Sequence, residues 1–259
     1  MYQFSSLIDY LNEVLFNIIH LRHNQNIRGQ ILINQIFFTG YEALPIVLLI
    51  ALSLGGAVIQ VGLDILGGLG HADWVYKLLV GTAVRDVGPI IISFVLLLRS
   101  GTAIATEIGT MKVNKEIDAL LSLGISPVSY LVAPRIVGMV ASIVLLMFYF
   151  SATSVLGGYI ISSLSNPLPF SEFMYQFSRA LSVWDIVIMI SKVTICGFMI
   201  GGICTFQSLQ VNLALTEIPQ RNIKAVTHCV IVVMGINLIF LIGEIYTSDL
   251  GGLAKYASY

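Results

Sequence analysis

The chain has 259 residues, of which 57% are hydrophobic and only 10% are charged, with 13 lysines and arginines against 14 aspartates and glutamates. An ordinary soluble domain carries about 25% charged residues, so this chain has too little charge to cover a water-exposed surface. The same composition excludes intrinsic disorder, and a net charge of −1 offers no basic footprint for nucleic acid. What remains is an integral membrane protein, built from helices or as a closed barrel.

Long apolar runs predict transmembrane helices, because the strands of a barrel alternate apolar and polar residues over about ten positions. A helix needs about 20 apolar residues to cross a bilayer. Five runs meet this requirement, namely Ala43–Leu63, Trp74–Leu98, Ile136–Tyr159, Ile186–Phe206 and Ala225–Gly243. The predicted fold class is an all-α membrane protein with a five-span domain over residues 39–247 and a short C-terminal tail over residues 248–259.

Residues 1–38 precede the first span and contain an amphipathic pattern. Six apolar residues recur at helical spacing, namely Leu7, Leu11, Val14, Leu15, Ile18 and Ile19. Polar residues occupy the opposite face, namely Asp9, Asn12, Glu13 and Asn17. This pattern predicts an interfacial helix that lies in the membrane plane and leads into the first span. The alternative is a soluble helix packed on cytoplasmic loops.

The distribution of lysine and arginine predicts the orientation of the chain in the membrane. Eight basic residues fall on one side, namely Arg22, Arg28, Arg99, Lys112, Lys115, Arg135, Arg221 and Lys224. The other side has three, Lys77, Arg179 and Lys255, beside several carboxylates. We therefore expect the N-terminus in the cytoplasm and the C-terminus on the opposite side.

The segment between the second and third spans is the most charged stretch of the chain. Val113, Ile117, Leu120 and Leu121 line one helical face, and polar residues line the other. Gly124 is typical of a helix C-terminus, with a proline three residues later. We expect a short amphipathic helix over about residues 108–124. Patterning alone leaves open whether it lies on the lipid headgroups or docks on a protein partner.

Charged residues inside the apolar runs are costly, so each is expected to face a partner or a polar cavity. Arg85 and Asp86 interrupt the second span, and Pro89 is expected to kink it. Adjacent residues on a helix do not face each other, so the candidate partners are Arg99, Glu107, Lys192 and Glu244. Lys192 is expected either to extend to the membrane surface or to line a cavity, and Glu244 to lie at the interface.

Two glycine patterns indicate close helix packing. Gly197 and Gly201 form a GxxxG pair in the fourth span, and Gly55, Gly56 and Gly62 lie in the first. We interpret the GxxxG pair also as weak evidence for a dimer face.

No catalytic or metal-binding constellation is present in the sequence. There is no Gly-Lys dipeptide and hence no phosphate-binding P-loop, and neither HExxH nor GxSxG occurs. The three cysteines lie in apolar runs at spacings that match no zinc site. We expect no enzyme activity, no metal and no cofactor on this chain, so that another chain must supply any nucleotide site.

Three segments together resemble the MlaE permease family. Span 1 contains GYEALPIVLLIALSLGGAVIQ (Gly40–Gln60), similar to the family's G-x-x-A-L-P-I-V entry. RDVGPII (Arg85–Ile91) is similar to the family's R-E-L-G-P-V, with Asp86 in place of the usual glutamate. The 37-residue stretch Arg99–Arg135 follows the family pattern nearly residue by residue. The resemblance runs from about Thr39 to Phe240.

The resemblance implies a function for two sets of residues. The first is a cytoplasmic coupling helix that docks on a separate ABC ATPase, carried by Glu107, Lys112, Glu116, Ile117, Asp118, Leu120 and Leu121. The second surrounds a lipid cavity between two copies of the permease, with apolar walls and intramembrane charges that include Leu48, Leu52, Ile59, Ile236, Phe240, Arg85, Asp86, Arg99 and Lys192. Among these, Arg85, Arg99 and Lys192 are the candidates to contact a lipid phosphate.

The implied function is that of the permease subunit of an ABC transporter for lipid, most simply phospholipid. ATP and Mg would be bound by the ATPase, and an MCE-domain lipid-binding protein would be a further partner. The segment SLQVNLALTEIPQRNIKAVTHC (Ser208–Cys229) departs from the family's glycine-rich pattern, which leaves the identity of the ATPase partner open. The alternative function is a membrane scaffold that anchors an MCE-domain protein without transport. The expected location is a bacterial inner membrane or, alternatively, a plastid inner envelope.

Overall fold

The computed structural model describes residues 7–20, 35–37, 39–66, 73–165, 169–212 and 214–256, and this part of the chain contains helices and turns without strands. Within it, five helices are long and apolar enough to cross a membrane, and each predicted span lies inside one of them. They cover Gln35–Ile65, Trp74–Val113, Val128–Leu164, Val183–Leu209 and Glu217–Tyr246. The predicted fold class, an all-α membrane protein with five spans, is confirmed.

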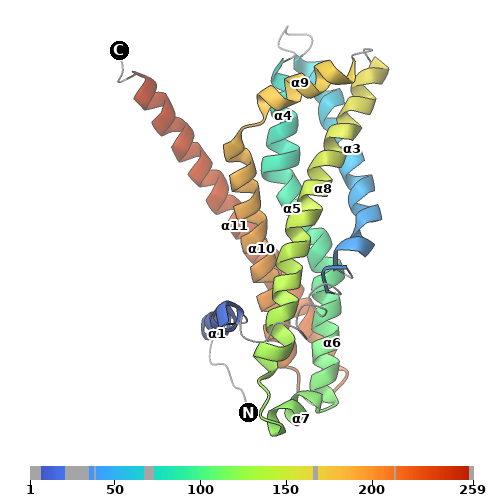
Figure 1. The fold of residues 1–259 in the computed structure, drawn as a ribbon, viewed down its shortest axis with the longest axis vertical. Coiled ribbons are helices and arrows are strands. Elements are labelled where there is room, and N and C mark those ends of the chain that lie inside the picture. The colour runs from blue at the N-terminus through green and yellow to red at the C-terminus, as the bar shows by residue number, and fades with distance from the viewer. Residues whose placement is uncertain are drawn as a thin grey trace.

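Figure 1 shows an elongated bundle with one short helix at each end. In chain order the α-helices are α1 (Leu7–His20), α3 (Leu44–Leu66), α4 (Asp73–Leu79), α5 (Val87–Leu96), α6 (Thr102–Val113), α7 (Glu116–Ser122), α8 (Ala133–Ser165), α9 (Phe170–Ala180), α10 (Val183–Leu209) and α11 (Glu217–Tyr256). The helix α9 closes one end of the bundle and α7 the other, while α11 leans away from its neighbours (Figure 1).

The second span is one long rod made of three α-helical pieces. Two π-helical segments, Val80–Asp86 and Leu97–Gly101, join α4 to α5 and α5 to α6. A Cβ atom on Gly88 would lie 2.0 Å from the carbonyl oxygen of Ala83, so only glycine fits beside the first wide turn. The kink expected at Pro89 therefore takes the form of a π-helical segment that ends just before the proline.

Glycines let α3 and α8 pack backbone against backbone. A Cβ atom on Gly55 would lie 1.8 Å from the carbonyl oxygen of Ser154, and one on Gly157 would lie 2.4 Å from that of Leu52. Small residues allow such close approach between membrane helices, where packing rather than the hydrophobic effect drives association. The prediction of close packing at Gly55 is confirmed.

The GxxxG pair of α10 also packs inside the chain. A Cβ atom on Gly197 would lie 2.9 Å from a side-chain carbon of Ile143, and one on Gly201 would lie 3.0 Å from Ile136. Both contacts are with α8, so the interpretation of this pair as a dimer face is wrong. The two glycines are used to seat α10 on α8 within one chain.

The N-terminal helix α1 lies across the long axis of the bundle (Figure 1). Tyr10 and Val14 are fully buried in a cluster with residues of α8 and α10, and the Tyr10 hydroxyl donates a hydrogen bond of 2.9 Å to Thr205 Oγ1. Burial raises the pKa of Tyr10. Leu15, predicted to share the apolar face of α1, is instead 48% exposed, because Tyr10 completes the packed face in its place.

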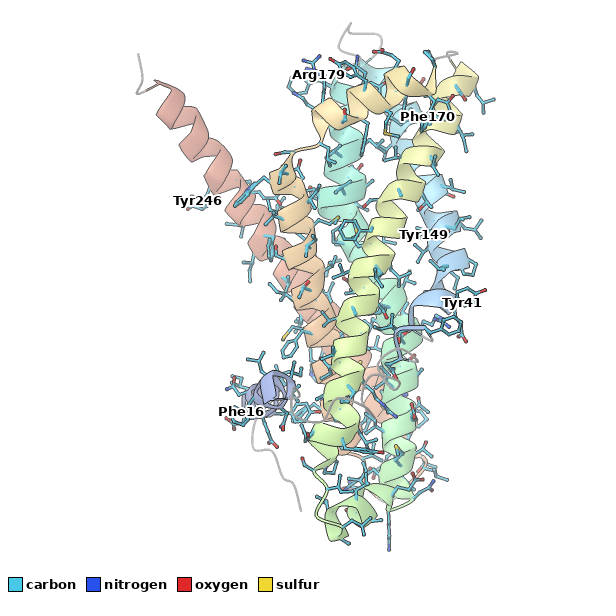
Figure 2. The ribbon with its side chains drawn as sticks, in the orientation of Figure 1. Phe16, Tyr41, Tyr149, Phe170, Arg179 and Tyr246 are labelled. Atoms are coloured by element: carbon cyan, nitrogen blue, oxygen red, sulfur yellow. The ribbon has the colours of Figure 1, made fainter. Side chains whose placement is uncertain are left out.

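A second apolar stripe on α1 faces away from the bundle. Ile8 and Phe16 are 68% and 61% exposed, and Figure 2 shows Phe16 on the outer side of the helix. The helix thus has one face on protein and another open to its surroundings. The rest of the predicted lead-in, residues 21–34 with Arg22 and Arg28, lies outside the described residues.

The last helix is longer than the sequence suggested. Where a short tail was expected from residue 248, α11 continues without a break to Tyr256. Its exposed side is apolar over many turns, namely at Ile231, Met234, Leu238, Ile239, Leu241, Ile242, Ile245 and Tyr246.

Candidate functional site

Five charged side chains from three segments meet inside the bundle. Arg85 Nε lies 2.8 Å from Glu244 Oε2, and Arg85 Nη1 lies 3.6 Å from Asp185 Oδ1. Lys192 Nζ lies 3.3 Å from Asp86 Oδ1 and 4.0 Å from Glu244 Oε1. We call these five residues the ionic network. Charges inside a membrane protein are costly and normally pair with one another, as they do here.

Pro89 explains how the ammonium group of Lys192 is held. Proline has no backbone N–H, so it cannot donate to the carbonyl oxygen four residues earlier, which is that of Arg85. Lys192 Nζ donates to this oxygen instead, at 2.7 Å. The side chain of Lys192 is 1% exposed, and its ammonium also lies 5.7 Å from the centre of the Phe240 ring. The proline and the lysine therefore form one structural unit across α5 and α10.

A capping box holds Asp185 in the network. The Ser182 hydroxyl accepts a hydrogen bond of 3.3 Å from the N–H of Trp184, and the Ser182 N–H donates one of 2.9 Å to Asp185 Oδ2. This reciprocal arrangement satisfies the first turn of a helix. It also leaves the other carboxylate oxygen of Asp185 directed at Arg85, so the start of α10 and the network are fixed together.

The predicted partners of Arg85 and Asp86 separate into two groups. Lys192 and Glu244 are in the network, which confirms that part of the prediction, whereas Arg99 and Glu107 are elsewhere. Arg99 forms an ion pair with Glu42 at the start of the first span, and Glu107 lies 2.6 Å from Arg135.

Two members of the network add to what was predicted. Glu244, expected at the interface near the end of its span, is only 8% exposed and is enclosed by the bundle. Asp185 was missed as a network member, although Ser182 and Asp185 stand at capping-box spacing and could have signalled it.

A half-open cavity of about 210 Å³ adjoins the network. Its polar lining comes from Asp86, Lys192 and Asn237, and its apolar lining from Ile90, Met234, Leu238 and Leu241. The cavity lies between α5, α10 and the exposed side of α11. We call it the network cavity.

None of the predicted apolar wall residues is in the lining of this cavity, and only Ile236 and Phe240 lie on a helix that borders it. Ile236 packs against the protein core, and Phe240 lies over Lys192. Leu48 and Leu52 are half-buried on α3. Ile59 is 1% exposed, because it is enclosed by α4 and α8 residues such as Leu79 and Val155; a lipid outside this protomer does not reach it.

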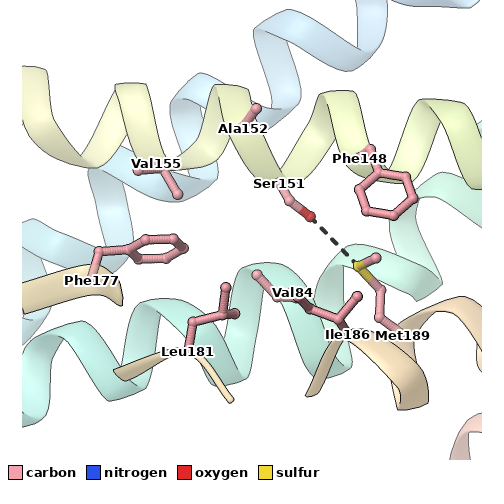
Figure 3. Close-up of a pocket in the computed structure, with 9 residues that line it drawn as sticks. All are labelled: Val84, Phe148, Ser151, Ala152, Val155, Phe177, Leu181, Ile186 and Met189. Carbon is pink, nitrogen blue, oxygen red and sulfur yellow. Dashed lines mark hydrogen bonds between the residues drawn. The ribbon is translucent and has the colours of Figure 1, made fainter. Parts of the chain in front are cut away.

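A second, apolar cavity of about 210 Å³ lies between α8, α9 and α10 (Figure 3). It is lined by Val84, Phe148, Ser151, Ala152, Val155, Phe177, Leu181, Ile186 and Met189. The Ser151 hydroxyl is its main polar group and contacts the sulfur of Met189 at 3.8 Å. This lining suits hydrocarbon and offers no charge to a polar ligand.

The expected amphipathic helix over residues 108–124 is broken into two helices. The α6 rod ends at Val113, and Lys115 adopts φ 61°, which turns the chain into α7 (Glu116–Ser122). A residue in the left-handed conformation cannot continue a right-handed helix, so α6 and α7 are separate helices. The predicted end is confirmed at Gly124, whose φ is 75°.

The α7 end, which we call the tip, has one buried and one exposed side. Ile117 is buried, Lys112 Nζ lies 3.4 Å from Asp118 Oδ1, and Leu120 and Leu121 are half-buried. Glu116 and Asp118 face solvent, as do the apolar Leu123 (75% exposed) and Ile125 (39% exposed). The tip thus presents a mixed acidic and apolar surface, of the kind that fits a groove on another protein. Leu123 and Ile125 were not among the predicted coupling residues.

These features define a helical membrane protein with a charged network inside the bundle and a protruding tip at one end. The family described as Permease MlaE matches residues 32–242, so the chain belongs to the MlaE permease family.

Two relatives match most of the chain at low identity, and a third matches a shorter part of it at higher identity. The chain is 24% identical over 215 residues to a probable ABC transporter permease protein of Rickettsia typhi, covering 83% of this chain and 82% of that protein. It is 24% identical over 210 residues to the intermembrane phospholipid transport system permease protein MlaE of Haemophilus influenzae, covering 81% and 80%. It is 31% identical over 117 residues to protein TRIGALACTOSYLDIACYLGLYCEROL 1, chloroplastic, of Arabidopsis thaliana, covering 45% and 33%.

Proposed function

We propose that this chain is the permease subunit of an ABC transporter that moves phospholipid through a cavity formed by two copies of the chain. The observation that carries the proposal is the network cavity, in which a polar, charged wall adjoins apolar residues of α11 at membrane depth. A phospholipid has the matching composition, with a polar headgroup and apolar chains. The named function of the Haemophilus relative supports the same substrate class.

The homodimer is supported by the unpartnered side of α11. This helix is poorly enclosed by its own chain, with 22% of its membrane window buried, against 56% for the span that contains α8. Its exposed side borders the network cavity through Met234, Leu238 and Leu241. A second copy placed against this side would enclose the cavity, and the bilayer would supply lipid at its edges.

The tip is the proposed contact with the ATPase. In this proposal Glu116 and Asp118 supply charge, Leu123 and Ile125 supply the apolar contact, and the α6 rod carries movement toward the network. ATP and Mg are bound by the ATPase alone. The tip side is the cytoplasmic or stromal side, and an MCE-domain protein meets the opposite end. The membrane is a bacterial inner membrane or a plastid inner envelope.

Reconstitution with the ATPase tests the proposal and separates it from the scaffold alternative. The double variant Glu116→Lys with Asp118→Lys should lose ATPase binding and ATP-driven lipid movement in vesicles, because two exposed charges are reversed. Glu172→Lys, on the exposed surface of α9 at the other end of the bundle, is the control for ATPase binding and should retain it. A wild-type complex that binds an MCE-domain protein but moves no lipid with ATP would establish the scaffold instead.

A further inference from the structure

The polar wall of the network cavity offers hydrogen-bond acceptors, whereas its donors are mostly used within the protein. Its ammonium group, on Lys192, already donates to the Arg85 carbonyl oxygen at 2.7 Å and to Asp86 Oδ1 at 3.3 Å. An ammonium has three donors, and Glu244 Oε1 lies 4.0 Å from this Nζ. Two of the three donors are therefore used by protein acceptors, and the charge is balanced by two carboxylates. This argues against the expectation that Lys192 contacts a lipid phosphate, because a phosphate needs donors.

Asn237 adds a free acceptor to the same wall. The residue is 8% exposed, and its Nδ2 donates a hydrogen bond of 2.8 Å to the carbonyl oxygen of Val233. That bond fixes the amide, so Oδ1 is directed away from its own helix backbone. Oδ1 is buried and has no hydrogen-bond partner among the described residues. A buried polar atom without a partner costs about 1–3 kcal/mol, so this oxygen indicates a ligand.

Asp86 supplies the second acceptor. Its side chain is 40% exposed although it lies at membrane depth, and it lines the same cavity as Asn237. A carboxylate has about four lone-pair sites, and Lys192 uses one of them. The cavity thus offers a carboxylate and an amide oxygen to whatever enters it, both of which accept hydrogen bonds.

We propose that Asp86 and Asn237 bind the primary ammonium group of a phospholipid headgroup, so that the transporter favours amine-bearing lipids. The inference rests on the proposed lipid-transport function and specifies its substrate class. A primary ammonium donates three hydrogen bonds and carries the charge that the carboxylate attracts. A volume of about 210 Å³ suits a headgroup, since pockets that enclose whole drug-sized ligands measure about 300–1,000 Å³.

The test is a lipid competition in the purified full-length protein. The protein is equilibrated in nanodiscs of equal phosphatidylethanolamine, phosphatidylcholine and phosphatidylglycerol and transferred to mild detergent, and the retained lipids are then measured by mass spectrometry. Phosphatidylcholine keeps the positive charge but has no N–H donor, and phosphatidylglycerol has no ammonium. Wild-type protein should enrich phosphatidylethanolamine over both by about tenfold, the factor that a charge-assisted hydrogen bond supplies.

Three variants identify the residue responsible. Asn237→Leu keeps the side-chain size without the oxygen and should lower both ratios, leaving only the preference that Asp86 supplies. Asn237→Asp keeps an acceptor and should retain the preference. Leu145→Ala, on the exposed surface of α8 and outside both cavities, is the control and should leave the ratios as in wild type. Thermal unfolding and gel filtration of each variant establish that it is folded before its lipids are compared.

Each remaining result would overturn the inference. Equal retention of phosphatidylcholine and phosphatidylethanolamine would show that donation plays no part, and enrichment of phosphatidylglycerol would restore the phosphate assignment. An unchanged preference in a folded Asn237→Leu protein would remove Asn237 from the site, and parity in wild type would leave water as the ligand of Oδ1. If wild-type protein retains no lipid at all, the proposed transport function fails, and this inference fails with it.

Discussion

Replacing Gly55 by alanine should separate α3 from α8 and destabilise the whole bundle. The new Cβ atom would lie 1.8 Å from the carbonyl oxygen of Ser154 and 2.8 Å from its Cα atom. Both atoms belong to the backbone of α8, so no side-chain rotation relieves the clash. The helices must move apart by about 1 Å, which opens gaps along a close-packed interface. Overpacking costs about 1–3 kcal/mol, and a clash with backbone belongs at the upper end of that range.

Thermal unfolding in detergent, followed by loss of the monodisperse gel-filtration peak, measures this cost. A loss of about 3 kcal/mol should lower the Tm by roughly 6–12 °C, on the scale of domains of comparable length. Gly81→Ala is the control, because a Cβ atom there meets nothing within 4 Å, and its Tm should stay within about 2 °C of wild type. If Gly55→Ala unfolds at the wild-type temperature, the direct backbone contact between α3 and α8 does not exist in the protein.

Four further predictions follow from the same contacts. Lys192→Met leaves Asp86 and its neighbours without their buried cation and should cost about 3–5 kcal/mol in unfolding experiments; adding Asp86→Asn should restore part of that loss, and no recovery would contradict the pairing. Tyr10→Phe removes one buried hydrogen bond and should raise hydrogen exchange in α1 by roughly the factor of ten that about 1 kcal/mol gives, whereas unchanged exchange would show that the bond contributes nothing. Lys115→Gly relieves a left-handed residue and should raise the Tm, since that conformation costs about 1 kcal/mol or more outside glycine; a lower Tm would mean that the lysine side chain stabilises the turn. Burial raises the pKa of Glu13 above 4.5. The stability that the protonated carboxyl contributes is therefore fully present below that pH and is lost as the pH rises through the folded-state pKa. The Tm of Glu13→Gln should exceed that of wild type at about pH 7 and match it at about pH 4, and parallel pH profiles would exclude this linkage.

Existence of the five spans followed from the sequence, because an unbroken run of about 20 apolar residues has few other stable arrangements. The faces that these helices present to one another did not follow. Apolar residues surround each span, so periodicity does not distinguish lipid-facing from packed positions. Ile59 was named as a cavity-wall residue from its span alone, and the GxxxG pair of α10 was correctly interpreted as a close-packing motif but also as weak evidence for a dimer face, although it packs on α8.

The members of the ionic network were partly predictable from the sequence, whereas the contact that Pro89 makes possible was not. The cost of burying Arg85 and Asp86 required partners, and only a few charges lay within reach along the chain, which led to Lys192 and Glu244. The burial of Glu244 inside the bundle was not predictable, because α11 continues past the point where the apolar run stops. The role of Pro89 in freeing a carbonyl oxygen for Lys192 depends on two helices at once, so it became visible only with the fold.

Residues 102–124 show the limit of pattern reasoning at the tip. Val113 and Ile117 repeat at helical spacing on both sides of Lys115, and the pattern therefore continues through a break. The left-handed turn at Lys115 is a backbone feature that a lysine does not signal. The Gly124 turn was predicted, because glycine is the residue that tolerates positive φ without strain.

The two π-helical segments of the second span also determine how a force would travel along it. Each wide turn interrupts the regular α-helical hydrogen-bond pattern of the rod, so we expect the rod to bend there before it bends within α5 or α6. From α7 the first such segment is Leu97–Gly101 and the second is Val80–Asp86, and pairs of spin labels across each segment would record the bending. Because the second segment contains both Arg85 and Asp86, we expect a displacement of the tip to reach the ion pairs of the network through it.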